Sequence, residues 1–148
     1  MTLPRSEGGP AQAESVARSV DLDAAPTEVW DALTEETLLG EWLADEVELE
    51  AEPGGEIVCR YADGEERRGE VELVEEAERL AWSWWREGEG PSRVELVLDA
   101  VADGTRLTVI ETASIPAAGP LLAAAPPAAG AWGPPLARLR ATVRLVLA

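Results

Sequence analysis

From residue 46 to residue 113 the chain repeats one pattern, in which a run of alternating apolar and polar residues is followed by a tight turn. Alternation with period two places successive side chains on opposite faces of a strand, and "DG" pairs such as those at 63–64 and 103–104 are typical of β-hairpins. The pattern therefore predicts about six consecutive antiparallel strands with one buried and one solvated face. The strand segments are "EVELE", "EIVCRY", "RRGEVELVEEA", "RLAWSWW", "SRVELVLDA" and "TRLTVIETA".

The segment before this region changes period. Residues 15–24, "SVARSVDLDA", alternate well enough to predict a first strand. Pro26 suits the first position of a helix over "APTEVWDALT", and Thr34 is expected to cap a second short helix, "EETLLGEWL", which Gly40 is expected to loosen or end. Two short helices are therefore expected between the first strand and the run of hairpins.

The C-terminal part consists of a connection rich in Ala, Pro and Gly, followed by a helix. In residues 117–135, sixteen of nineteen residues are Ala, Pro or Gly, and this segment is expected to be a loop. An apolar stripe then follows with spacings of four, three, four and three residues, which predicts a long amphipathic helix. The stripe consists of Trp132, Leu136, Leu139, Val143 and Val146. Since the apolar face of the sheet needs a cover, the helix is expected to lie on it.

Together these elements predict an α+β fold of the helix-grip kind. In it, a curved antiparallel sheet of about six or seven strands grips a long C-terminal helix, and two short helices follow the first strand. Residues 1–14 are polar, with Pro and Gly, and are expected to be a disordered tail. Residues 15–148 are expected to form a single domain, because 148 residues suffice for one core.

Composition excludes several kinds of function. The formal charge of −17 argues against nucleic acid and against anionic membrane surfaces, since both are bound through Lys and Arg. Histidine is absent, so the commonest general base and transition-metal ligand is missing. No cofactor, metal site or catalytic set is expected. With a single cysteine and no apolar signal region, the chain is expected to be cytoplasmic, as a monomer or homodimer.

Five segments, in order and spacing, carry a family resemblance. They are "DAAPTEVWDALT", "LLGEWL", "EPGGEIVCRYADGEERRGEVELVEEAERLAWSW", "VELVLDAVADGTRLTVIET" and "LARLRATVRLVL". From about residue 15 to the C-terminus the chain resembles the START-like (SRPBCC) superfamily, whose fold is shared with birch-pollen allergens. Within it, the chain is similar to the branch named after the activator of the ninety-kilodalton heat-shock protein's ATPase.

The resemblance implies a cavity between the sheet and the C-terminal helix that takes an apolar or aromatic small molecule. Relatives include polyketide cyclases or aromatases, resistance proteins of enediyne antibiotic producers, and co-chaperones. We therefore expect a non-catalytic binder of a hydrophobic ligand, with antibiotic sequestration as its specialised form. A cyclase-like enzyme, with Tyr61 and Glu111 or Arg60 assisting, and a co-chaperone-like interaction module are the alternatives.

The run "LAWSWW" at 80–85 is the most distinctive candidate for a ligand wall. Alternation points Leu80, Trp82 and Trp84 to one side of the strand and Trp85 to the other, and the family resemblance implies that the first set faces inward. Either the two inward indoles fill a core that has no phenylalanine, or they line the cavity and offer their N–H groups to a ligand. Other expected ligand-binding residues are Tyr61 and Leu96 on strands, and Trp42, Trp132, Leu139 and Val143 on helices.

The remaining polar residues are assigned ordinary roles. Cys59 shares the inward face with Ile57 and is expected to be a small core residue rather than a nucleophile. Val71 and Leu73 are expected to face inward together. The many alternating glutamates are expected to cover the wet face of the sheet. Glu56, Arg60 and Glu111 are the charged residues expected at the rim of the cavity, where they need partners or water.

Overall fold

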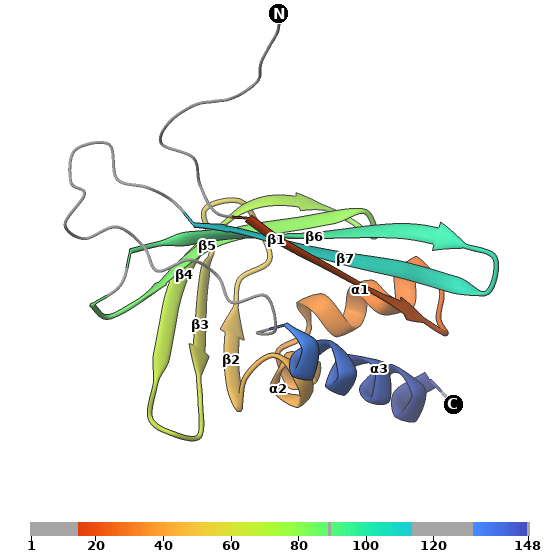
Figure 1. The fold of residues 1–148 in the computed structure, drawn as a ribbon, viewed down its shortest axis with the longest axis horizontal. Helices are drawn as coiled ribbons and strands as arrows, with labels where there is room; N and C mark the ends of the chain where they lie inside the picture. The colour runs from red at the N-terminus through yellow and green to blue at the C-terminus, as the bar shows by residue number, and fades with distance from the viewer. Residues whose placement is uncertain (1–14, 89, 114–131, 148) are drawn as a thin grey trace, which may run out of the picture.

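The structure is a computed structural model that describes residues 15–88, 90–113 and 132–147. The expected N-terminal tail, residues 1–14, and most of the expected connection, residues 117–131, lie outside the described residues. Figure 1 shows a strongly curved sheet with the helices gathered on one side of it. The α+β helix-grip architecture expected from the sequence is confirmed.

All seven strands belong to one antiparallel sheet. The strands are β1 (Ser15–Leu22), β2 (Glu46–Leu49), β3 (Glu56–Arg60), β4 (Glu66–Glu75), β5 (Arg79–Arg86), β6 (Ser92–Val101) and β7 (Gly104–Ala113). Their order across the sheet is β1-β7-β6-β5-β4-β3-β2. From β2 to β7 each strand therefore pairs with the next one in sequence, as successive hairpins require, and only β1 pairs with a strand distant in the chain.

The helices are α1 (Pro26–Thr34), α2 (Glu36–Trp42) and α3 (Gly133–Leu147). Helix α3 contacts both short helices and β1. It begins at Gly133, so the last three residues of the expected 117–135 loop are helical. No helix within the described ranges combines the length and the apolar content that crossing a membrane requires.

The expected cap of α2 was wrong, and one of the two effects expected of Gly40 is excluded. Thr34 does not cap α2, because its hydroxyl donates back to the carbonyl of Trp30 inside α1 and Glu35 occupies the capping position. Gly40 does not end α2, which continues to Trp42. Pro26 is the first residue of α1, as expected, and Glu28 accepts a hydrogen bond of 3.0 Å from the Ala25 amide.

The inward sheet face and the helices enclose one hydrophobic core. Trp42, Trp82, Leu96 and Leu139 are each 0 % exposed and fill its centre. Burial of four such side chains contributes roughly 1.5–3 kcal/mol apiece or more to folding, so these residues are structural whatever else they do. Trp85, on the opposite face, is 45 % exposed, as the alternation predicts.

A β-bulge contradicts the expectation that the side chains of Val71 and Leu73 face the same side of the sheet. Val71 pairs with Trp82, but Leu73 pairs with Ala81, because the register of β4 shifts by one residue between them. Val74, and not Leu73, therefore returns to the inward face and packs against the core. Strict alternation cannot reveal this, since a bulge inserts an extra residue and reverses the phase that follows.

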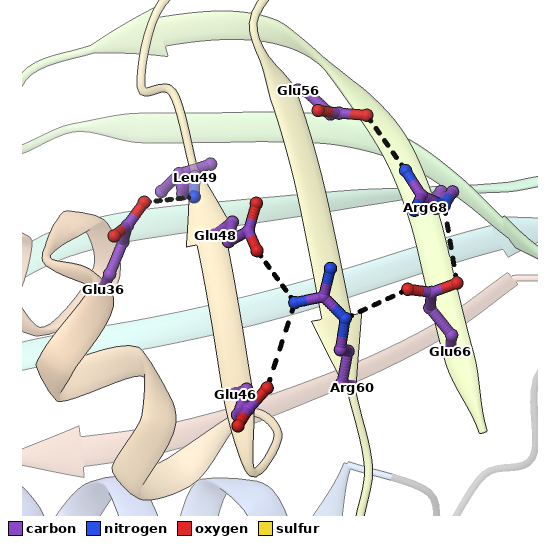
Figure 2. A network of polar contacts seen from close by, with 8 residues as sticks. All are labelled: Glu36, Glu46, Glu48, Leu49, Glu56, Arg60, Glu66 and Arg68. Carbon is purple, nitrogen blue, oxygen red and sulfur yellow. Dashed lines mark hydrogen bonds and ion pairs between the residues drawn. The ribbon is translucent and has the colours of Figure 1, made fainter. Parts of the chain in front are cut away.

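The outward face of β2, β3 and β4 is covered by alternating charges. Figure 2 shows Arg60 between three carboxylates, with Nη1 2.8 Å from Glu48 and Nε 3.2 Å from Glu66. Arg68 contacts Glu56 and Glu66 in the same way, at 3.3 and 3.4 Å. Arg60 and Glu56 therefore lie on the wet face. Arg60 borders a depression of about 450 Å³ together with Glu46 and Tyr61, and none of the described residues that line this depression belongs to α3.

Candidate functional site

Polar residues on the inward face gather at one end of the sheet, where the ends of neighbouring strands meet. Because the strands are antiparallel, the start of β4, the end of β5, the start of β6 and the end of β7 meet there. The residues concerned are Arg67, Trp84, Arg86, Ser92 and Glu111. Arg67 is the cross-strand partner of Arg86, Trp84 that of Ser92, and Glu111 that of Val94. The topology thus brings residues from four strands to one place.

Glu111 links the residues at this end of the sheet through hydrogen bonds. It is 6 % exposed, and its two carboxylate oxygens accept hydrogen bonds from three side chains. Trp132 Nε1 donates to Oε1 at 2.9 Å, while Trp84 Nε1 and Ser92 Oγ donate to Oε2 at 3.2 and 2.6 Å. A buried carboxylate needs such donors, because an unpaired charge away from water is very costly. Glu111 therefore fixes the orientation of both indoles.

The two indoles bound to Glu111 also stack on each other. The ring centroids of Trp84 and Trp132 are 6.1 Å apart and their planes differ by 13°, while Trp82 meets Trp84 edge-on at 5.5 Å. The guanidinium of Arg67 lies over the Trp84 ring, 4.5 Å from its centroid. Its Nη1 is also 3.8 Å from a Glu111 oxygen. The cation, the rings and the carboxylate thus form one connected cluster.

This cluster borders a cleft of about 220 Å³. The lining residues are Leu43, Tyr61, Arg67, Trp84, Arg86, Glu111, Trp132, Pro135 and Arg138. Trp84 and Trp132 are only 3 % and 4 % exposed, so each indole presents little surface to the cleft and the two form its floor. The cleft is smaller than the roughly 300–1,000 Å³ of ligand pockets in general, so it suits a small molecule or one end of a longer one.

The expected ligand-binding residues divide into two groups. Tyr61, Trp84 and Trp132 line this cleft. Trp42, Trp82, Leu96, Leu139 and Val143 lie in the core, and Val143 also borders a separate depression of about 150 Å³ between α1 and α3. The indole of Trp42 donates to the carbonyl of Ala32 at 2.9 Å, whereas Trp82 Nε1 is buried with no hydrogen-bond partner among the described residues.

Tyr61 in the cleft and the nearby Cys59 favour their neutral forms. Burial raises the pKa of the Tyr61 phenol to about 12, and the charges of Arg67 and Arg86 offset this only in part. Burial likewise raises the pKa of the Cys59 thiol to about 12. At neutral pH the tyrosine is therefore a hydrogen-bond donor rather than a base, and the thiol is not a nucleophile.

Sequence reasoning missed the arginines. The alternation that places Gly69 and Val71 inward on β4 also places Arg67 inward, and Arg86 follows Trp82 and Trp84 by the same rule. The signal was therefore present in "RRGEV" and "WSWWR". Arg138 is not part of the apolar stripe of α3, and it donates a hydrogen bond to the carbonyl of Trp42 at 3.2 Å.

Three solved structures of similar fold illustrate the architecture. Protein MLL2253 of Mesorhizobium loti is 20 % identical, with a TM-score of 0.76, and the alignment covers 88 % of this chain and 97 % of that one. CalU16 of Micromonospora echinospora is 24 % identical, with a TM-score of 0.70 and coverage of 91 % and 79 %. No curated protein matches the chain significantly.

A third structure is DynU16, a protein in the dynemicin biosynthetic locus. It is 24 % identical, with a TM-score of 0.73 over 88 % of this chain, which spans about half of DynU16, 47 % of its length. The sequence model of one family, described as activator of Hsp90 ATPase homolog 1-like protein, matches residues 23–144, which include every strand from β2 to β7. The chain therefore belongs to the activator of Hsp90 ATPase homolog 1-like family.

Proposed function

We propose that the protein binds an apolar or aromatic small molecule in the cleft between the end of the sheet and α3. The observation that supports this is the stack of Trp84 and Trp132, held by Glu111 at the floor of an open cleft. An aromatic floor with a few fixed polar groups is the usual composition of a small-molecule site. The buried tryptophans of the core then support the cleft rather than contact the ligand.

A binding role fits the chemistry of the cleft better than catalysis does. The carboxylate of Glu111 is occupied by three donors. The raised pKa values of Tyr61 and Cys59 keep these groups protonated at neutral pH. With no histidine in the chain, no residue described at the cleft is poised as a general base.

A cyclase- or aromatase-like activity is the second candidate. It is favoured by the Arg67–Glu111 pair beside the open cleft, with Tyr61 as a further donor. Such groups could fold a reactive chain and polarise its carbonyl groups without a base of their own. Turnover of a polyketide-like substrate, lost in Tyr61→Phe while binding persists, would establish this activity in place of simple binding.

Sequestration of an antibiotic is the specialised form of the binding proposal. DynU16, which shares the fold, comes from the dynemicin biosynthetic locus. The compounds tested should therefore include dynemicin beside simpler aromatic and polyketide-like molecules. Binding of dynemicin in preference to simple aromatics would support the specialised role.

Two neighbouring tryptophans provide a matched test. Trp84 borders the cleft, whereas Trp85 faces the other side of the sheet. We expect saturable quenching of tryptophan fluorescence by a ligand, with the same affinity by calorimetry. Trp84→Phe should weaken binding several-fold, and Trp85→Phe should leave it unchanged, both variants being checked for folding by thermal melting. Equal effects of the two variants, or no binding by any compound, would contradict the proposal.

A further inference from the structure

The charge of the cleft is opposite to that of the protein. The whole chain carries −17, yet three arginines and one glutamate line the cleft, a local excess of two positive charges. Arg67, Arg86 and Arg138 supply the positive charges, from β4, β5 and α3. A concave surface that concentrates one sign of charge attracts ligands of the other sign.

Two of these arginines stand directly opposite each other. Arg67 and Arg86 are cross-strand partners on the inward face, where like charges destabilise a sheet. The Nε atoms of both are buried and have no hydrogen-bond partner among the described residues. A pair of cations facing each other with unused donors costs stability, and an anion in the cleft would remove that cost.

Several arginines of the outward face form short hydrogen bonds with carboxylates, unlike those of the cleft. Arg93 donates to Glu72 and Arg106 to Asp21, each at 2.8 Å, and Figure 2 shows Arg60 bound by carboxylates from two neighbouring strands. At the cleft, the contact of Arg86 with Glu65 is 3.6 Å and that of Arg67 with Glu111 is 3.8 Å, both longer than a hydrogen bond. Arg138 donates to a main-chain carbonyl. Arg67 and Arg86 are thus paired with carboxylates only at 3.8 and 3.6 Å, although the protein has carboxylates in excess.

Glu111 does not fill this role itself. Its oxygens already accept hydrogen bonds from Trp84, Trp132 and Ser92. Glu111 balances one of the three positive charges, so an excess of two positive charges is available to another group. The Tyr61 hydroxyl, which stays protonated at neutral pH, adds a neutral donor to the same cleft.

We propose that the ligand is an aromatic or apolar acid whose carboxylate is bound by Arg67 and Arg86, with Arg138 at the side of α3. This inference rests on the proposed small-molecule binding and names its chemical class. The aromatic part of the acid lies against Trp84 and Trp132. Arginine suits the task because its planar guanidinium binds a carboxylate through two parallel hydrogen bonds.

The test compares two compounds of the same shape, 2-naphthoate and 2-naphthamide, by calorimetry at pH 7. We expect 2-naphthoate to bind about tenfold more tightly, because hydrogen bonds between charged groups are stronger than neutral ones. Its affinity should fall as NaCl is raised from 50 to 500 mM, while that of the amide should not change.

Neighbouring arginines on β4 provide the control. Arg67→Gln and, separately, Arg86→Gln should reduce the preference for the acid to less than threefold, whereas Arg68→Gln, on the outward face, should preserve it. Thermal melting identifies any variant that fails to fold, and two cleft variants are used so that loss of one leaves the other. Arg67→Gln also removes the cation from the Trp84 ring, so Arg86→Gln is the cleaner variant.

The results that would contradict the carboxylate site differ from those that would contradict small-molecule binding. Equal binding of 2-naphthoate and 2-naphthamide would overturn the carboxylate site and leave small-molecule binding intact. A preference for the acid that survives in both Arg67→Gln and Arg86→Gln would place the anion elsewhere and likewise overturn the inference. Absence of binding by both naphthyl compounds and by every compound of the wider panel would overturn the proposed function, and the carboxylate site with it.

Discussion

The carboxylate of Glu111 accepts a hydrogen bond of 2.9 Å from the indole of Trp132, and this bond joins the end of β7 to the residue before α3. The same carboxylate binds Trp84 on β5. One buried acidic group therefore couples the last helix to the sheet and sets the floor of the cleft. Removal of its charge should affect stability and site geometry together.

Glu111→Gln should lower the free energy of unfolding by about 1–3 kcal/mol. The amide retains one oxygen but places an NH₂ group against an indole or hydroxyl donor, so a buried donor loses its acceptor. Urea denaturation measures the loss. The matched control is Glu72→Gln, since Glu72 also accepts hydrogen bonds from a serine, Ser83, and an arginine, Arg93, but on the exposed face. A loss in Glu72→Gln as large as that in Glu111→Gln would contradict the special role of the buried carboxylate.

Gly69→Ala should destabilise the protein by about 1–3 kcal/mol, because a methyl group there overpacks the sheet. A Cβ at Gly69 would lie 2.8 Å from the Cα of Trp84 and still closer to the carbonyl oxygen of Ser83. Gly40→Ala is the contrasting variant, since its Cβ would meet only the Asp45 carbonyl, at 3.5 Å, inside α2. It should stabilise the protein by about 0.5–1 kcal/mol through helix propensity. A change of the melting temperature in the same direction for both variants would contradict this prediction.

Stability should fall as the pH rises from about 9 to about 12. In the folded protein the pKa of Cys59 and that of Tyr61 are raised to about 12, from 9.0 and 10.0. Across this range the unfolded chain releases protons that the folded chain retains, so the free energy of unfolding decreases, by up to about 1.4 kcal/mol per pH unit for each group. Below pH 9 both states hold these protons and the two groups cause no pH dependence.

The double variant Cys59→Ala/Tyr61→Phe isolates this effect. Its stability should decline less steeply than that of the parent protein when urea denaturation is repeated at pH 8, 9, 10 and 11. Each single variant should give an intermediate slope. Parallel curves for the parent and the double variant would show that the alkaline loss of stability arises from other groups.

Cys59 should resist alkylation in the native protein. The thiol is 0 % exposed and its pKa is raised by burial, so little thiolate is present at pH 8 and reagents cannot reach it. Mass spectrometry after treatment with iodoacetamide should show an unmodified chain in buffer and one added group in 6 M guanidinium chloride. Rapid labelling of the native protein would mean that β3 opens locally.

Much of the fold follows from local pattern. The alternation of residues 46–113 predicted six strands correctly, since each strand has one buried and one wet face. The facing of Leu73 could not be predicted, because the bulge depends on how β4 and β5 pair and leaves no local signature. The caps of α2 were misjudged because Thr34 bonds backward within α1.

The cleft was only partly predictable. Alternation places Trp84 and Glu111 inward, and it places Arg67 and Arg86 there too, although inward arginines at strand ends are easily taken for solvated termini. The hydrogen bond between Glu111 and Trp132 depends on how α3 docks on the sheet, and no spacing within either element encodes it. The core position of Trp82 likewise depends on the packing of the helices against the sheet and not on its strand alone.

The separation of core from cleft has a consequence for how such a protein diversifies. The central side chains, such as Trp82 and Leu96, stabilise the core, whereas the residues proposed to bind a ligand lie where the ends of four strands meet. Substitutions of the less buried residues at those ends, such as Arg67 and Arg86, would change the ligand that is bound without disturbing the core. One scaffold can therefore acquire new selectivities by exchanging a few terminal residues, and descendants with little sequence in common can still keep the same architecture.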